Sequence, residues 1–189
     1  MSINWKIRTK CLLSLIGGVS YSDSETLDID VYVFSQLNKK DIHILLIDFA
    51  SSLGEKWDKY LDRLKDTYWK VQDYNITLER LNYDLSKSNH EYVKSVFEKA
   101  DVLYLGGWDP LRLYDALNEI NISEILETYL MNPNKAIIGK SAGAVVLFEK
   151  FIYPIDETWE YAYSNGLGIV NGLVCAHFSE KWRQSVLKE

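Results

Sequence analysis

The 189-residue sequence has few cysteines and lacks any long apolar run. Two cysteines, Cys11 and Cys175, are too few for a disulfide framework and lack the spacing of metal ligands. Both lie in apolar segments, so we expect two buried, reduced thiols. No apolar run reaches the roughly 18 residues that a membrane-spanning helix requires, and we recognise no signal peptide. These absences favour a reducing, cytoplasmic location and no association with membranes.

Basic residues are in the minority, with 21 Lys and Arg against 27 Asp and Glu. A chain with a net charge of -6 gives no electrostatic reason to expect a nucleic acid partner. The sequence also lacks a metal-ligand cluster and a dinucleotide-binding fingerprint, so we expect no metal and no cofactor. Its 47% hydrophobic and 25% charged residues are typical of a globular protein. The length predicts a single domain over residues 1–189.

Short apolar segments alternate with longer amphipathic ones along the chain. This alternation is typical of an α/β fold in which helices cover both faces of a mostly parallel sheet. In such a fold the ligand site lies beyond the carboxyl ends of the strands. Strands are expected over 11–16, 42–49, 75–81, 101–105, 135–139 and 173–176. Helices are expected over 26–37, 54–72, 89–99, 142–148 and 180–188, with two more that begin near Asp109 and Ser123.

The most informative motif is G-x-S-x-G, read as Gly139-Lys140-Ser141-Ala142-Gly143. It stands between a short apolar strand and an apolar helix, which is the context of a nucleophile elbow. In so sharp a turn a side chain at either glycine would collide with neighbouring backbone. Ser141 would then stand at the tip with strained backbone angles, near helix N–H groups that can stabilise an oxyanion. The alternative is a glycine-flanked serine in an ordinary tight connection or a phosphate-binding turn.

A nucleophilic serine requires a base, and the chain has three histidines. His177 follows an apolar segment, so we expect it at the carboxyl end of a strand, on the same edge of the sheet as Ser141. From its position in the sequence alone, His177 fits a histidine buried in the core nearly as well as it fits a catalytic base. His43 falls at the amino end of a predicted strand and His90 precedes an amphipathic helix, so both are expected to be structural or solvated.

A third group must orient the imidazole, and three carboxylates lie between the serine and the histidine. These give the chain order Ser, acid, His, although any one of them is equally consistent with an ordinary surface carboxylate. The candidates are Asp156, Glu157 and Glu160.

Three blocks of the sequence resemble the dipeptidase E and cyanophycinase family of serine peptidases. They are a strand with a Gly-Gly turn and a helix over 102–117, the nucleophile motif over 139–144, and a Gly-Leu-Gly segment that leads to a histidine over 166–178. Their order and spacing agree from about residue 100 to residue 188, whereas the first hundred residues match loosely. The resemblance implies a three-layer α/β/α sandwich similar to class I glutamine amidotransferases, with serine in place of cysteine.

The resemblance also implies roles for individual residues. Ser141 would be the nucleophile and His177 the general base, and the backbone N–H groups of Gly107 and Ala142 would bind the oxyanion. In dipeptidase E the acid lies fifteen residues after the serine, where this chain has Asp156. Cyanophycinases place a glutamate slightly later, which would favour Glu157 or Glu160. We expect Asp156 to be the acid that orients His177, with Glu157 as the alternative.

The chain departs from the family after the Gly-Gly pair. The family has Asn or Asp followed by Thr, Ser or Gln, whereas this chain has Trp108-Asp109 in a turn that contributes to substrate binding. The implied activity is hydrolysis of short peptides, with Asp-containing peptides among them, by a monomer or a homodimer. A substrate carboxylate would need a cation, for which the candidates are Arg112, Lys140 and Arg183.

Two further expectations remain open from the sequence. The same scaffold would also suit a hydrolase or acyltransferase of a non-peptide substrate, or an inactive member that acts by binding. Family members usually continue for at least one more strand, which leads us to expect a shortened member or a truncated chain.

Overall fold

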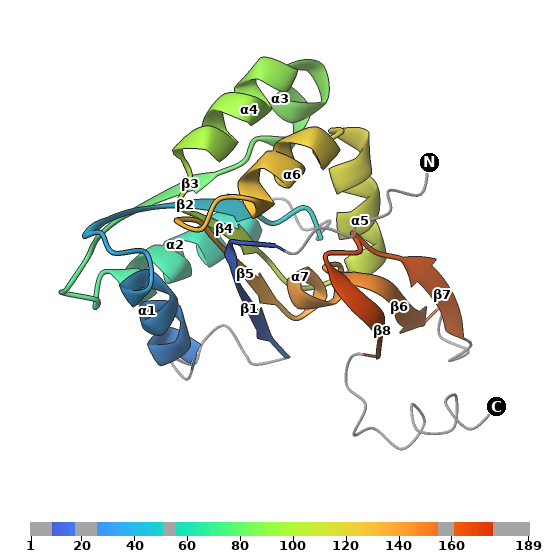
Figure 1. Cartoon of the computed structure of the whole chain (residues 1–189), viewed down its shortest axis with the longest axis horizontal. Coiled ribbons are helices and arrows are strands. Elements are labelled where there is room, and N and C mark those ends of the chain that lie inside the picture. Colours follow the sequence, from blue (N-terminus) through green and yellow to red (C-terminus); the bar gives the residue numbers. More distant parts are fainter. Residues whose placement is uncertain (1–8, 18–25, 51–55, 155–160, 176–189) are drawn as a thin grey trace.

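The computed structural model describes residues 9–17, 26–50, 56–154 and 161–175, which form two β-sheets with helices packed around the larger one (Figure 1). The larger sheet is entirely parallel and has the strand order β1-β5-β4-β2-β3. Its central strands are almost completely buried, which explains their continuous apolar sequences. The strands are β1 (Leu12–Ile16), β2 (Asp41–Ile47), β3 (Asn75–Arg80), β4 (Val102–Leu105) and β5 (Ala136–Lys140).

Helices cover both faces of this sheet, as the side chains of β4 show. Val102 and Tyr104 pack in a core with α1 and α2, whereas Leu103 and Leu105 pack in a second core with α4, α5 and α6. The predicted three-layer α/β/α sandwich is therefore confirmed. The helices on the first face are α1 (Leu27–Ser35) and α2 (Lys56–Tyr68). The others are α3 (Tyr83–Ser88), α4 (His90–Lys99), α5 (Pro110–Glu119), α6 (Ser123–Leu130) and α7 (Ala142–Val145).

A second sheet of three strands was not predicted. It consists of β6 (Phe148–Pro154), β7 (Tyr161–Asn165) and β8 (Val170–Cys175) in the order β7-β6-β8. β6 pairs antiparallel with β7 and parallel with β8. The expected helix over 142–148 ends early because its last residues turn into β6. The strand expected over 173–176 is β8, and it belongs to this second sheet rather than to the parallel one.

The Gly166–Val170 segment fastens the second sheet to the residues behind the G-x-S-x-G motif. The backbone N–H groups of Leu167 and Val170 donate to the carbonyls of Val146 and Leu147 at 2.7 and 2.9 Å. The approach is so close that a Cβ on Gly166 would lie 2.2 Å from the Phe148 carbonyl oxygen. The conformation of this segment thus fixes where β8 begins.

The two cysteines differ in their burial. Cys11 is buried, and this burial raises the pKa of its thiol to about 11. Cys175, at the end of β8, is only half-buried, so the expectation of two buried thiols holds for Cys11 alone. Within the described ranges, no helix is both long and apolar enough to cross a membrane.

Candidate active site

Ser141 occupies the turn between β5 and α7 and has unusual backbone angles. Its φ is 52° and its ψ is -116°, in a region that costs a residue with a side chain about 1–3 kcal/mol. The strained conformation predicted for the tip of a nucleophile elbow is therefore confirmed. Such strain persists only where the surroundings hold the residue in place.

Backbone hydrogen bonds hold Ser141 on both sides. Its N–H donates to the carbonyl of Ile16, the last residue of β1, at 2.8 Å. Its carbonyl accepts from the N–H groups of Ala144 at 2.9 Å and Val145 at 3.0 Å, which closes the first turn of α7. The serine is thus fixed between the carboxyl end of the parallel sheet and the short helix that follows.

The two glycines of the motif are required by close backbone contacts. A Cβ on Gly139 would lie 2.6 Å from the carbonyl oxygen of Gly143. A Cβ on Gly143 would lie only 2.1 Å from the carbonyl oxygen of Leu105, at the end of β4. The collisions expected from the sequence are therefore present, and they press the elbow against the turn that follows β4.

We predict that Gly143→Ala destabilises the fold by about 3 kcal/mol or more, because the new methyl group must displace backbone atoms. The same substitution should also lower the rate at which a serine-reactive probe labels Ser141. Gly106→Ala is a matched control, since a Cβ there would meet its nearest atom at an ordinary 3.5 Å. Urea unfolding of both variants tests the prediction, and equal stability of Gly143→Ala and Gly106→Ala would contradict it.

The proposed oxyanion donors lie at the ends of neighbouring strands. β4 pairs with β5 in parallel, with Leu105 opposite Gly139, so the turn at Gly107 and the elbow at Ala142 share one edge of the sheet. Both residues are buried. The N–H of Gly106 donates to the Ile47 carbonyl at 2.9 Å and extends the strand pairing by one residue. The structure therefore brings the two turns together as the sequence analysis expected.

Trp108 and Asp109, which replace the family's usual residues, have different surroundings. Trp108 has a φ of 123° and a side chain that is 67% exposed, so its ring offers an apolar surface beside the site. Asp109 caps α5, and its Oδ1 accepts from the N–H groups of Leu111 at 2.9 Å and Arg112 at 3.2 Å. A helix was predicted to begin near Asp109, and the observed cap uses the carboxylate of this residue to stabilise the start of that helix.

Lys140 does not extend into solvent. Its side chain is 13% exposed and its Nζ lies 3.0 Å from Oδ2 of Asp30 on α1. It also donates to the hydroxyl of Thr26 at 2.7 Å. As a cation for a substrate carboxylate it is poorly placed, because it already neutralises a buried carboxylate.

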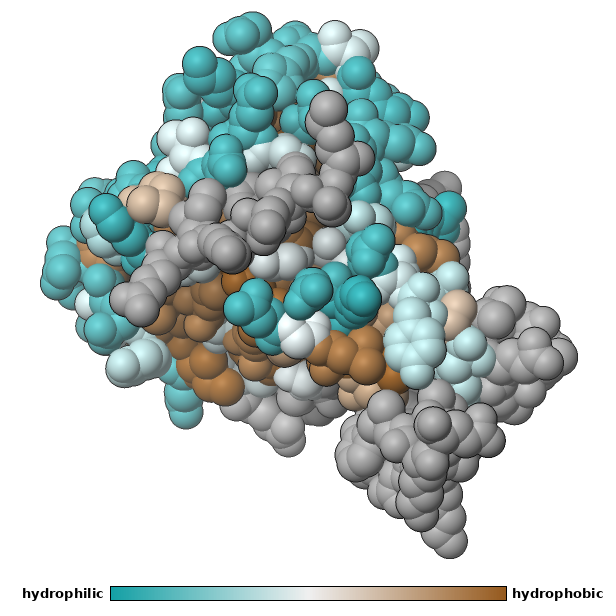
Figure 2. All heavy atoms as spheres, turned by 45° about the vertical axis from the view of Figure 1, so that its right-hand side comes forward, coloured by the Kyte–Doolittle hydropathy of each residue, from teal (hydrophilic) through white to brown (hydrophobic). Residues whose placement is uncertain are grey.

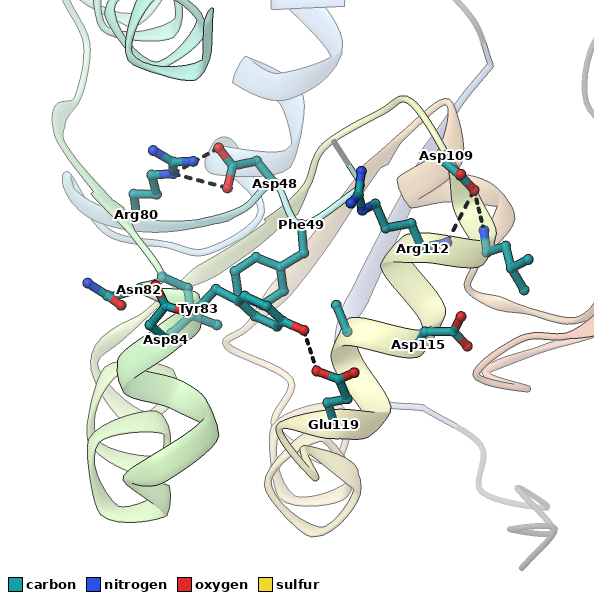
Figure 3. A pocket seen from close by; sticks show the side chains of 13 residues that line it. Asp48, Phe49, Arg80, Asn82, Tyr83, Asp84, Asp109, Arg112, Asp115 and Glu119 are labelled. Carbon is teal, nitrogen blue, oxygen red and sulfur yellow. Dashed lines mark hydrogen bonds and ion pairs between the residues drawn. The ribbon is translucent and has the colours of Figure 1, made fainter. Parts of the chain in front are cut away.

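A pocket of about 1030 Å³ lies between α5 and the carboxyl ends of β2 and β3 (Figure 3). At one side Arg80 pairs with buried Asp48, with Nε 2.9 Å from Oδ2. At the other, the hydroxyl of Tyr83 donates to Glu119, and this hydrogen bond raises the pKa of Tyr83 to about 12. Arg112 extends from α5 toward the pocket (Figure 3), which makes it the candidate cation that the described residues place beside an open volume.

The remaining histidines of the described ranges fit the roles expected for them. His43 lies near the amino end of β2, and its Nε2 is 2.9 Å from Oε2 of Glu79. His90 is exposed at the start of α4. His43 therefore lies at the opposite end of the strands from Ser141.

Several predicted residues lie outside the described ranges, namely His177, Asp156, Glu157, Glu160 and Arg183. One premise behind the placement of His177 is nevertheless wrong, because the strand before it lies in the second sheet rather than beside Ser141. The Gly166–Val170 segment connects that strand to the elbow, because it donates backbone hydrogen bonds to Val146 and Leu147, the two residues that follow α7. Pairing between distant segments of this kind leaves no local signal in the sequence.

The comparisons with known proteins agree with this architecture. The chain matches the model of peptidase family S51 over residues 13–189 and therefore belongs to that family, the dipeptidase E family. It is a serine-type peptidase. No curated protein matches the sequence.

Two solved structures share the fold. A peptidase from an acI-B1 Actinobacterium superposes with a TM-score of 0.68 at 18% identity, over 94% of this chain and 75% of its own. A protein from Listeria monocytogenes EGD-e, provisionally assigned to peptidase E, superposes with a TM-score of 0.58 at 16% identity, over 93% of this chain and 84% of its own.

Proposed function

We propose that this peptidase hydrolyses short peptides, Asp-containing ones among them, with Ser141 as nucleophile, His177 as general base and Asp156 as the acid that orients it. The observation that carries the proposal is the strained backbone of Ser141 at the carboxyl end of β5. In a nucleophile elbow, a serine held in this conformation presents its hydroxyl above the edge of the sheet. The neighbouring positions Gly139 and Gly143 have no space for a Cβ, as such a sharp turn requires.

The proposed reaction proceeds through an acyl-enzyme. Oγ of Ser141 attacks the scissile carbonyl while His177 accepts its proton, and the N–H groups of Gly107 and Ala142 bind the oxyanion. His177 then returns the proton to the leaving amine, and water hydrolyses the ester by the reverse sequence. The adjacency of the turns after β4 and β5 supports this pairing of donors.

The second sheet supports an acid and a base that come from neighbouring segments. β6 and β8 are parallel partners, with Ile152 opposite Cys175, so both chains leave the sheet at the same edge. Asp156 follows the end of β6 and His177 follows the end of β8 by two residues each. Counted from the paired residues Ile152 and Cys175, Asp156 lies four residues on and His177 two, so both follow the same end of the second sheet closely in sequence, which supports the proposed pairing.

The substrate's acidic side chain would be met by Arg112. This residue borders the pocket at the carboxyl ends of β2 and β3, the edge of the sheet that also holds Ser141, whereas Lys140 is paired with Asp30. We predict that Arg112→Ala raises KM at least 10-fold for an Asp-containing dipeptide and leaves KM of its Asn counterpart within about 2-fold, because a charge-assisted contact is lost. Arg63→Ala, an exposed change on α2, is the control. Equal effects on both dipeptides would contradict this role.

A dipeptide panel tests the proposed function. Wild-type protein and Ser141→Ala are incubated with dipeptides that differ in their first residue, and released amino acids are quantified by mass spectrometry. We expect release by the wild type alone, strongest with Asp. Cleavage of non-peptide esters without any dipeptide release would instead indicate a different hydrolase, and equal release by Ser141→Ala would exclude this nucleophile.

A further inference from the structure

A buried charged network lies directly beneath the elbow, on the face of the sheet opposite α7. At its centre is Asp30 of α1, which is 2% exposed. Its Oδ2 accepts from Nζ of Lys140 at 3.0 Å and from the hydroxyl of Tyr68 at 3.1 Å. The same Nζ donates to Thr26 and lies 5.2 Å from the centre of the Tyr104 ring.

Stability alone is a weak reason for such a pair. Removing two charges from water costs several kcal/mol for each ion, and apolar residues of similar volume often serve the fold as well or better. The negative charge of Asp30 also depends on Lys140, because burial raises the pKa of Asp30 and the nearby lysine opposes that rise. A role in geometry accounts for the pair better than a role in stability.

Lys140 is the residue immediately before Ser141. Its backbone stands opposite Ile16 in the pairing of β5 with β1, and Ile16 is also the acceptor for the N–H of Ser141. On the other side of the serine, Gly143 is pressed against Leu105. The strained residue is thus flanked by two fixed points, one on each face of the sheet.

We propose that Lys140 is a positioning residue for Ser141, and that its ion pair with Asp30 anchors the elbow to α1. The anchor fixes the last residue of β5, so that the strain at Ser141 cannot relax by a shift of the preceding peptide. This inference rests on the proposed function, since it takes Ser141 as the nucleophile. A displacement of about 1 Å in a reacting group can cost roughly 100-fold in rate.

The decisive variant is the double substitution Lys140→Met/Asp30→Asn. Lys140→Met alone would leave a buried carboxylate without its counter-charge, whereas the double variant removes both charges and keeps the volume. We expect a melting temperature close to that of the wild type, a 10- to 100-fold slower phosphonylation of Ser141 by a fluorophosphonate, and a KM for the best dipeptide within about 2-fold. A wild-type phosphonylation rate would overturn the proposal.

Two further variants keep the outcome unambiguous. Thr26→Val is isosteric, removes one hydrogen bond of Lys140 and should still slow phosphonylation severalfold; a wild-type rate in this variant would also contradict the anchor. Lys39→Met/Asp101→Asn removes a pair whose atoms are 2.7 Å apart near the amino ends of the strands, and it should leave the rate unchanged. Failure of the wild type to react at Ser141 would overturn the proposed function itself, which is a separate outcome.

Discussion

Ser141→Ala and His177→Ala are each expected to lower kcat by about 10⁶-fold, and the double variant should lose little more. In the proposed mechanism the two side chains act in one proton transfer, so removing either one would remove the covalent route as a whole. Residual turnover would come from substrate binding and the oxyanion donors at Gly107 and Ala142. Single-turnover kinetics with the best dipeptide measures the effect.

His90→Ala is the matched control for the histidine, because His90 is exposed at the start of α4. It should keep wild-type kcat. Additive losses in the Ser141→Ala/His177→Ala variant would show that the two residues act independently, and a near-normal kcat in His177→Ala would place the base elsewhere.

Asp156→Asn should lower turnover by up to about 10⁴-fold, as the loss of an orienting acid does in other triads. The nucleophile and the oxyanion donors would remain, but control over the imidazole tautomer and its charge would be lost. Glu157→Gln should have a mild effect and Glu160→Gln a milder one. Acylation rates of the three single variants give the comparison.

The spacing from Ser141 is the reason for this expected order of effects, since Asp156 stands fifteen residues after the serine, where dipeptidase E has its acid. The parallel pairing of β6 with β8 is consistent with a carboxylate from this segment, because His177 follows the adjacent strand. A dominant defect in Glu157→Gln, with Asp156→Asn near the wild type, would show that the neighbouring carboxylate completes the triad. That result would leave the pairing of Ser141 with His177 intact.

The sequence was sufficient to predict the parallel sheet and the elbow, because both depend on local signals. Buried parallel strands have nearly continuous apolar sequences, and the segment 42–49 predicted β2 within two residues at either end. Gly139 and Gly143 flank Ser141 at a spacing that predicts a sharp turn. The structure shows why glycine is needed, because a Cβ on Gly139 would collide with Ala144 and a Cβ on Gly143 would collide with Leu105. Asp109 followed by Pro110 similarly marked the start of α5.

The second sheet and the network around Lys140 were not predictable in the same way. Only Val146 and Leu147 separate α7 from β6, and neither is a typical turn residue, so the sequence does not mark the start of this strand. The pairing of β6 with β8 also joins segments that are separated in the sequence. A lysine next to a nucleophile is expected to be exposed, because lysine is rarely buried. Its partner Asp30 precedes it by 110 residues, and only the packing of α1 against the sheet brings them together.

The most direct test of the central claim is the site of covalent reaction with a fluorophosphonate probe. The intact mass of the treated protein and the map of its peptides identify how many adducts form and where. Ser141 as an activated nucleophile predicts one adduct per chain, located on Ser141 and absent from Ser141→Ala. An adduct on another residue, or a folded wild-type protein that forms none, would contradict it.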